Sequence, residues 1–301
     1  MLPSGYAGCR ENQVYFTVKS KTGPALKRIL DKFYQDFDFT GTVSRDPIEF
    51  PHAYPRPEDS EIAGFIAAAF AYGNVNLFKP VVGTLLSCMG ESPFGFIRSF
   101  SVKRHGRLFS GIKYRFNEND DIIAFFFLLH ELIRKHGSIE TAFKRHYHHD
   151  DVDIGNALTG LIETLIAADI SPVYGSNIKP SGLLQLIPSP IKGSACKRMN
   201  LYLRWMIRDR DIDFGIWKGI TKNKLVIPLD THIARIGRCL GLTTRASQDW
   251  KMAVEITESL KKFDSEDPLK YDFALCHQGI SKLCSAKKCG DCRLFGKGII
   301  S

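Results

Sequence analysis

The stretch 183-LLQLIPSPIKGSACKRMNLYLRWMIR-208 carries the strongest fold signal in this sequence. A short apolar segment runs into Pro188, which cannot continue a helix, and Gly193 then permits a tight turn. Beyond the turn, apolar residues recur at helical spacing as far as Ile207. The pattern predicts two helices, over 180–187 and 194–208, that are joined by a short hairpin.

This hairpin has two interpretations. Taken alone, it is most simply a helix–turn–helix corner with no further role. It can also bind an anion, because glycine lets the backbone approach a phosphate and the following helix offers free N–H groups. Helix–hairpin–helix elements hold the DNA backbone in this way without reading the base sequence. On the second interpretation, the candidate DNA contacts in the hairpin are Lys192, Gly193, Ser194 and Arg198.

Lys197 falls in the first turn of the second predicted helix, where it faces the positive end of the helix dipole. That field disfavours an ammonium group, so it should lower the pKa of the lysine. A lowered pKa is what an amine nucleophile needs, because only the neutral amine attacks. Lys197 is therefore a candidate nucleophile.

Asp230 stands in 227-IPLDTHIARIGRCLGL-242, between an apolar run and an amphipathic helix. Aspartate is a preferred residue at this position, because its carboxylate accepts hydrogen bonds from the first N–H groups of the helix. Such a cap requires no function. A carboxylate held there also stays ionised, which suits a catalytic role beside Lys197 if the fold brings the two together.

Composition is that of an ordinary globular protein, with a formal net charge of +9. Between Lys192 and Lys224, nine basic residues stand against three acidic ones, and Tyr202, Trp205 and Trp217 lie among them. A solvated helix face would explain this segment, but basic residues with interleaved aromatic rings favour nucleic acid. We find no secretory signal and no apolar run of the roughly 20 residues needed to span a bilayer. We therefore expect a cytoplasmic protein with reduced thiols and no membrane partner.

Strand signals are sparse, and the expected fold class is all-α. Apolar spacing and glycine breaks place a proline-rich loop at 46–59 and helices at 24–37, 60–72, 76–88, 91–99, 119–136, 138–147, 154–168, 180–187, 194–208, 212–219, 230–241, 247–263 and 268–283.

The chain resembles the helix–hairpin–helix glycosylase superfamily of base-excision DNA repair. The hairpin with Lys197 and the segment 228-PLDTHIARI-236 carry this resemblance. More closely, the chain resembles an uncharacterised bacterial family within that superfamily, over roughly residues 24 to 285. The shared segments are 46-DPIEFPH-52, 59-DSEIAGFIAAAFAYGN-74, 186-LIPSP-190, 194-SACKRMNLYLRWMIR-208 and 228-PLDTHIARI-236.

The resemblance implies a two-lobed helical fold with the hairpin at the lobe junction. It gives Lys197 the nucleophile position and Asp230 the catalytic acid position. Asn74 and Asn76 fall where relatives insert polar side chains into the gap left by a flipped base. Trp205, Phe214 and Trp217 are candidates for the wall of a base pocket, although core packing would also explain them.

The sequence departs from the pattern of the glycosylase superfamily at two points, and these departures indicate which of its members is the nearer functional analogy. The hairpin reads PSPIKG with a single glycine, and the interval from Lys197 to Asp230 is longer than in endonuclease III-like enzymes. Archaeal 8-oxoguanine DNA glycosylases share a long interval and an irregular hairpin, so they are the nearer analogy. That analogy alone suggests an oxidised purine as substrate.

Four cysteines near the C-terminus, Cys276, Cys284, Cys289 and Cys292, form an incomplete version of the cysteine pattern that closes endonuclease III-like enzymes. They could hold a [4Fe–4S] cluster or zinc. A cysteine patch without metal is equally consistent with their spacing.

We expect an N-terminal extension over 1–22, a helical-barrel lobe over 60–195, a second lobe from 23–59 plus 196–293, and a tail over 294–301. The expected function is a monomeric DNA glycosylase with AP-lyase activity, acting on damaged bases in double-stranded DNA. The alternative is a non-catalytic module that binds DNA or RNA through the same hairpin.

Overall fold

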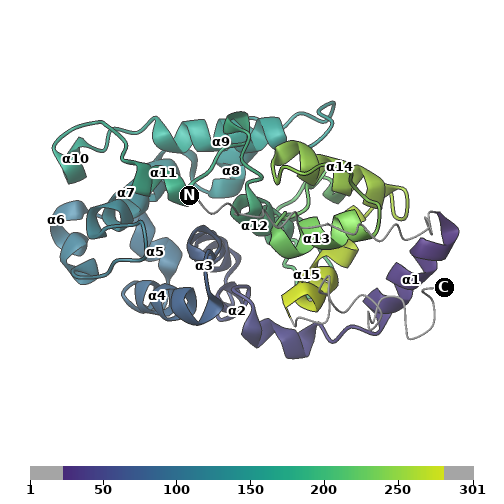
Figure 1. Cartoon of the computed structure of the whole chain (residues 1–301). Helices are drawn as coiled ribbons and strands as arrows, with labels where there is room; N and C mark the ends of the chain where they lie inside the picture. Colours follow the sequence, from purple (N-terminus) through teal and green to yellow (C-terminus); the bar gives the residue numbers. More distant parts are fainter. Residues whose placement is uncertain (1–22, 281–301) are drawn as a thin grey trace, which may run out of the picture.

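The protein, described here by a computed structural model over residues 23–280, is mostly helical. Figure 1 shows how its helices are arranged. Within residues 23–280 the extended pairing is limited to two isolated bridges, Tyr114 with Asn117 and Ser194 with Asp249. The expected all-α class is therefore confirmed for this part of the chain.

The α-helices of the described residues are α1 (Pro24–Gln35), α2 (Glu49–His52), α3 (Pro57–Phe70), α4 (Val75–Ser87), α5 (Pro93–Arg98), α6 (Val102–His105), α7 (Asn119–His136), α8 (Ile139–Lys144), α9 (Gly155–Ile166), α10 (Ser171–Tyr174), α11 (Ser181–Leu186), α12 (Lys197–Ile207), α13 (Thr231–Cys239), α14 (Trp250–Lys261) and α15 (Asp272–Ile280). Short 3-10 turns occur at η1 (Thr40–Arg45), η2 (Gly106–Phe109), η3 (Pro190–Lys192), η4 (Lys222–Lys224) and η5 (Pro268–Tyr271).

Helices α3 and α12 form the centre of the core. In α3 every residue from Asp59 to Phe70 is buried, which matches its apolar, alanine-rich sequence. The two helices pack closely at Gly64, where an added Cβ would lie 3.1 Å from the terminal carbon of Met206. A larger residue at position 64 would have to displace the Met206 side chain, so the glycine permits this close approach of α3 to the helix that begins with Lys197.

The remaining helices lie around this centre. In Figure 1 helices α4 to α7, α10 and α11 lie to the left of α12, α8 and α9 lie above it, and α1, α13, α14 and α15 lie to its right. Helices α13 and α15 pack against each other. The three helices that carry Lys197, Asp230 and Cys276 therefore start or pass near the middle of the molecule.

The secondary structure predicted for two segments was wrong. Residues 212–219, expected to be a helix, are irregular, because their N–H groups pair with the end of α12: Phe214 donates to the carbonyl of Trp205 at 2.8 Å and Trp217 to that of Met206 at 2.9 Å. The expected loop at 46–59 contains α2 and the start of α3, since Pro57 occupies a first-turn position where proline is tolerated.

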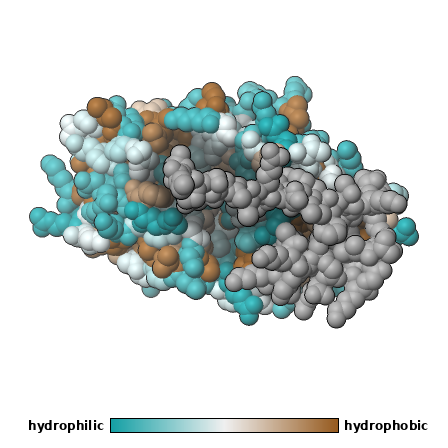
Figure 2. Space-filling view, in the orientation of Figure 1, coloured by the Kyte–Doolittle hydropathy of each residue, from teal (hydrophilic) through white to brown (hydrophobic). Residues whose placement is uncertain are grey.

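No helix within residues 23–280 is both long and apolar enough to cross a membrane. On the face drawn in Figure 2, the described residues present apolar side chains scattered among hydrophilic ones. Such scattered apolar residues are normal on a protein surface and do not mark a docking site.

Candidate active site

Helix α12 begins at Lys197, after a turn built from two left-handed residues. Gly193 has φ of 75° and Cys196 has φ of 47°. The hairpin is held from outside by α14, since Trp250 N–H donates to the carbonyl of Gly193 at 3.3 Å. The predicted helix start at Ser194 was three residues early, but the prediction that Lys197 lies in the first turn is confirmed.

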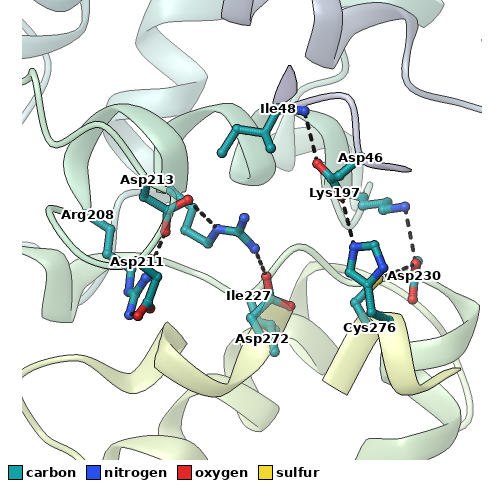
Figure 3. A network of polar contacts seen from close by, with 12 residues as sticks. Asp46, Ile48, Lys197, Arg208, Asp211, Asp213, Ile227, Asp230, Asp272 and Cys276 are labelled. Atoms are coloured by element: carbon teal, nitrogen blue, oxygen red, sulfur yellow. Dashed lines mark hydrogen bonds and ion pairs between the residues drawn. The ribbon is translucent and has the colours of Figure 1, made fainter. Parts of the chain in front are cut away.

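Asp230 is the N-cap of α13, as its position in the sequence predicted. Its Oδ1 accepts hydrogen bonds from the backbone N–H of His232 at 2.9 Å and of Ile233 at 2.8 Å. These bonds orient the carboxylate and leave Oδ2 for other donors. Lys197 Nζ lies 3.2 Å from this Oδ2, so the fold brings the two candidate residues into an ion pair (Figure 3).

The electrostatics of this pair differ from the sequence-based expectation for the lysine. Burial by itself lowers the pKa of Lys197, but the Asp230 carboxylate outweighs it and holds that pKa above its usual value. For Asp230, burial by itself raises the pKa. The Lys197 ammonium and the Ile233 N–H outweigh this effect and hold the pKa of Asp230 below its usual value. The expected depression of the lysine pKa was therefore wrong, and the resting pair is ammonium and carboxylate.

Cys276, on α15, contacts the same carboxylate. Its Sγ donates to Oδ2 of Asp230 at 3.6 Å. Burial, followed by the charge of Asp230, raises the pKa of Cys276 well above its usual value, so the group is a neutral thiol and a hydrogen-bond donor. Asp230 thus receives four donors, two on each oxygen. Four donors keep it ionised and fixed in position.

The pair lies in a cavity of about 840 Å³. Its lining comes from α12, α13, α15, the corner after α3 and the segment before α2, and includes Asp46, Asn74, Lys197, Asp230, Phe273 and Cys276. The Lys197 side chain is 37% exposed and that of Asp230 is 12% exposed, so a bound molecule can reach both. The volume falls in the range of ordinary small-molecule pockets.

Asp46 lines the cavity but was not among the residues predicted for the site. Its Oδ1 accepts from the N–H of Ile48 at 3.0 Å, and its Oδ2 lies 3.3 Å from Nε2 of His277 on α15. Figure 3 shows Asp46 above Lys197, on the side opposite Asp230. The only sequence signal for it is its place at the start of 46-DPIEFPH-52.

The basic segment 192–224 does not form one charged face. Arg204 pairs with Asp213 and Asp272, and Arg208 pairs with Asp211, Asp213 and Asp267. Both arginines are 2% exposed. This buried network joins α12 to α15 and to the loop after α12 (Figure 3), so much of the segment's positive charge is used inside the protein.

The candidate DNA contacts divide into surface and internal residues. Lys192 and Gly193 are exposed on the hairpin, and Ser194 is half-buried with Oγ accepting from the N–H of Cys196. Asn74 is exposed at the cavity and caps α4 by accepting from the N–H of Asn76 at 2.9 Å. Arg198 is turned inward: its guanidinium donates to the carbonyls of Ala69 and Gln185. The expectation of a DNA contact does not match that internal position.

The expected aromatic base pocket does not match the structure either. Trp205 is 0% and Trp217 3% exposed, and Trp217 Nε1 donates to Glu61 at 2.8 Å in the core. Phe214 is half-buried against His52, with ring centroids 4.4 Å apart. None of these three rings lines the cavity described above. The aromatic rings that do so are those of Tyr72, Phe78 and Phe273, none of which lies within residues 192–224.

Three of the four candidate metal ligands, Cys284, Cys289 and Cys292, lie outside the described residues. Cys276 lies inside them and is directed at Asp230. Within residues 23–280, no group of three or more histidine, cysteine or acidic residues is arranged to hold a metal ion.

Comparison with known proteins shows one family. No curated protein and no solved structure matches the chain. Residues 46–281 match a family described as "Protein of unknown function (DUF2400)", and this span begins with Asp46 and includes Lys197, Asp230 and Cys276. The chain belongs to this family.

Proposed function

We propose that this protein is a DNA glycosylase with associated AP-lyase activity, in which Lys197 is the nucleophile and Asp230 the catalytic carboxylate. The observation that carries the proposal is the 3.2 Å contact between Lys197 Nζ and Asp230 Oδ2, inside a cavity that an extrahelical nucleotide could enter. The resemblance to the helix–hairpin–helix glycosylases, with its two-lobed fold, supplies the reaction class.

A role in backbone binding alone would not explain this geometry. A lysine that binds phosphate works best as an exposed, unpaired charge on the surface. Lys197 is instead paired with a carboxylate that is itself fixed by two backbone N–H groups and a thiol. Such an arrangement presents an amine and a carboxylate to the same atom of a ligand, as amine attack at a sugar carbon requires.

The reaction needs Lys197 to lose a proton first, because its raised pKa keeps it as an ammonium at rest. As the N-glycosidic bond breaks, its electron pair leaves with the base, and the ammonium supplies the proton that the departing base takes. Asp230 stabilises the positive charge that develops at C1′. The neutral Nζ then bonds to C1′, and one of its protons passes to O4′ as the C1′–O4′ bond breaks and the protonated Schiff base forms. Transfer of a C2′ proton to the Asp230 carboxylate then breaks the C3′–O bond and expels the 3′ phosphate.

The hairpin suits the task of holding DNA near this cavity. Lys192 and Gly193 are exposed where the chain turns, directly before the helix that carries Lys197. Asn74 lines the cavity and is exposed. DNA contacts from the hairpin and from Asn74 would hold a flipped nucleotide at the cavity. The analogy with archaeal enzymes suggests 8-oxoguanine as the base.

The test is to incubate the protein with duplexes carrying 8-oxoguanine, uracil, thymine glycol or an abasic site, with and without borohydride. We expect base release from at least one lesion and a covalent adduct that is absent for Lys197→Gln. DNA binding without base release or adduct on any of these duplexes would overturn the proposal in favour of a binding module.

A further inference from the structure

We propose that Asp272, Arg204 and Phe273 form a base-recognition subsite, which selects nucleobases that present an N–H group beside a carbonyl on one edge. This inference rests on the proposed function, because it assigns the chemical class of the base that enters the cavity. Uracil, thymine, guanine, hypoxanthine and 8-oxoguanine have such an edge.

The first observation is a buried donor and a buried acceptor that lack partners. Nη2 of Arg204 and Oδ1 of Asp272 make no hydrogen bond with any described residue. Both residues line the cavity, and each is 2% exposed. Leaving a buried polar atom unpaired costs free energy, so such atoms in a native protein need an explanation. A ligand with a complementary acceptor and donor would supply it.

The second observation is that the other atoms of these two groups are already held. Arg204 Nη1 donates to Oδ2 of Asp272, and Arg204 Nε lies 3.3 Å from Oδ1 of Asp213. The guanidinium therefore has fixed neighbours, and the carboxylate is tied to it. A donor and an acceptor that belong to one fixed ion pair discriminate between bases better than mobile groups, because binding does not have to order them.

The third observation concerns the neighbours of the pair. Phe273 follows Asp272 on α15 and also lines the cavity, and the Arg204 guanidinium lies 5.5 Å from its ring centroid. The same ring also packs against Phe39, at 5.9 Å between centroids, and against His277, at 4.3 Å, so Phe273 supplies an apolar wall for the subsite and not a free stacking face. Burial raises the pKa of Asp272 to about 6, and the charge of Asp230 contributes to this rise, which places Asp272 within electrostatic reach of the catalytic carboxylate.

The two unpaired atoms are closed to water in the structure. A base must therefore displace the side chains that cover them, and the hydrogen bonds it then gains offset that rearrangement. A base with an amino group beside a bare ring nitrogen, as in adenine and cytosine, would place a donor against Arg204 and an acceptor against Asp272. Both contacts would be repulsive, which gives the subsite its selectivity.

The test measures affinity with the Lys197→Gln protein, which cannot form the covalent adduct. Its duplexes carry uracil, cytosine, hypoxanthine or adenine, each opposite a tetrahydrofuran residue, so that no base pair has to break. We expect uracil to bind at least about tenfold more tightly than cytosine, and hypoxanthine more tightly than adenine by a similar factor.

Adding Asp272→Asn should abolish or invert both ratios. Arg204 would hold the amide oxygen and leave the amide N–H facing the base, where cytosine and adenine offer an acceptor. Because the two duplexes of each pair are measured on the same protein, partial unfolding lowers both affinities and leaves the ratio intact. Asp267→Asn is the matched control, since Asp267 pairs with buried Arg208 but does not line the cavity.

Ratios near one for the Lys197→Gln protein, or ratios that Asp272→Asn leaves unchanged, would overturn the subsite. Failure of the proposed function looks different: the unmodified protein would then form no borohydride adduct on an abasic site, whatever the affinity ratios.

Discussion

Asp230 uses its two oxygens for two tasks: Oδ1 caps α13, and Oδ2 pairs with Lys197 at 3.2 Å. The cap orients the carboxylate, and the ion pair positions the amine that is proposed to react. Asp230 therefore has a structural role, through Oδ1, and a proposed catalytic role, through Oδ2. A substitution that keeps the cap but removes the charge can separate the two roles.

Replacing Asp230 with asparagine should cut base excision by about 10²- to 10³-fold, because the developing charge at C1′ loses its carboxylate. DNA affinity and melting temperature should change little, since asparagine also caps helices well. Single-turnover excision assays with melting curves would measure both. Asp249→Asn, at the N-cap of α14, is the matched control and should keep its activity; equal losses in the two variants would reduce Asp230 to a cap.

Replacing Cys276 with alanine should slow excision by about tenfold or less, because Asp230 loses one donor and a thiol is a weak one. Cys276→Ser retains a donor and should recover most of the rate. Measuring kcat and KM for the unmodified protein and both variants would test this, with a change expected in kcat and not in KM. Cys88→Ala is a suitable control, as the Cys88 thiol contacts the carbonyl of Leu108 instead. A serine variant as slow as the alanine variant would contradict the role of the thiol as a donor.

Arg198 and Lys192 should respond in opposite ways, although both were expected to bind DNA. Arg198→Ala removes the partner of two carbonyls and should lower the melting temperature by several degrees. Lys192→Ala should leave the melting temperature unchanged, weaken DNA binding and reduce the slope of log affinity against log salt by about 0.9. A large stability loss in Lys192→Ala would contradict its surface role.

Glu61 predicts a pH dependence of stability. Burial raises its pKa to about 7, even though it accepts from the N–H groups of Ile139 and Glu140 and from Trp217. A carboxyl with a raised folded pKa binds its proton more tightly in the folded state. Its stabilising contribution is therefore complete below its unfolded pKa of 4.5 and is lost as the pH rises through about 7.

Between pH 5 and 8, the melting temperature of the unmodified protein should fall relative to that of Glu61→Gln, which does not titrate there. Thermal melts of both proteins at each pH would measure this difference. Glu91→Gln, which removes an exposed carboxylate, controls for net charge. Parallel curves for the unmodified protein and Glu61→Gln would refute the shift.

Sequence reasoning succeeded where a local rule fixes the outcome. The cap at Asp230 and the helix over 119–136 follow from side-chain chemistry and apolar spacing, and both are present. It failed where residues outside a segment compete for that segment's hydrogen-bonding groups. The N–H groups of 212–219 bond to the end of α12 instead of forming a helix of their own.

In the candidate site too, features that depend on local chemistry were predicted, and features that depend on the path of the chain were not. The chemistry of Lys197 and Asp230 could be recognised, but their contact depends on the path of the chain between them. The arginines of α12 looked like a DNA surface because their partners Asp267 and Asp272 are distant in sequence. Phe273 lines the cavity without any local signal, and Asp46 is marked only by its place in 46-DPIEFPH-52, because the fold determines which residues surround the cavity.

The most direct test of the central claim is to locate the covalent bond. The protein is trapped with borohydride on an abasic-site duplex, digested with a protease and a nuclease, and sequenced by mass spectrometry. We predict a reduced sugar remnant on Lys197 and no adduct in Lys197→Gln. A remnant on any other lysine, or equal trapping by the Lys197→Gln protein, would contradict the assignment of Lys197 as the nucleophile.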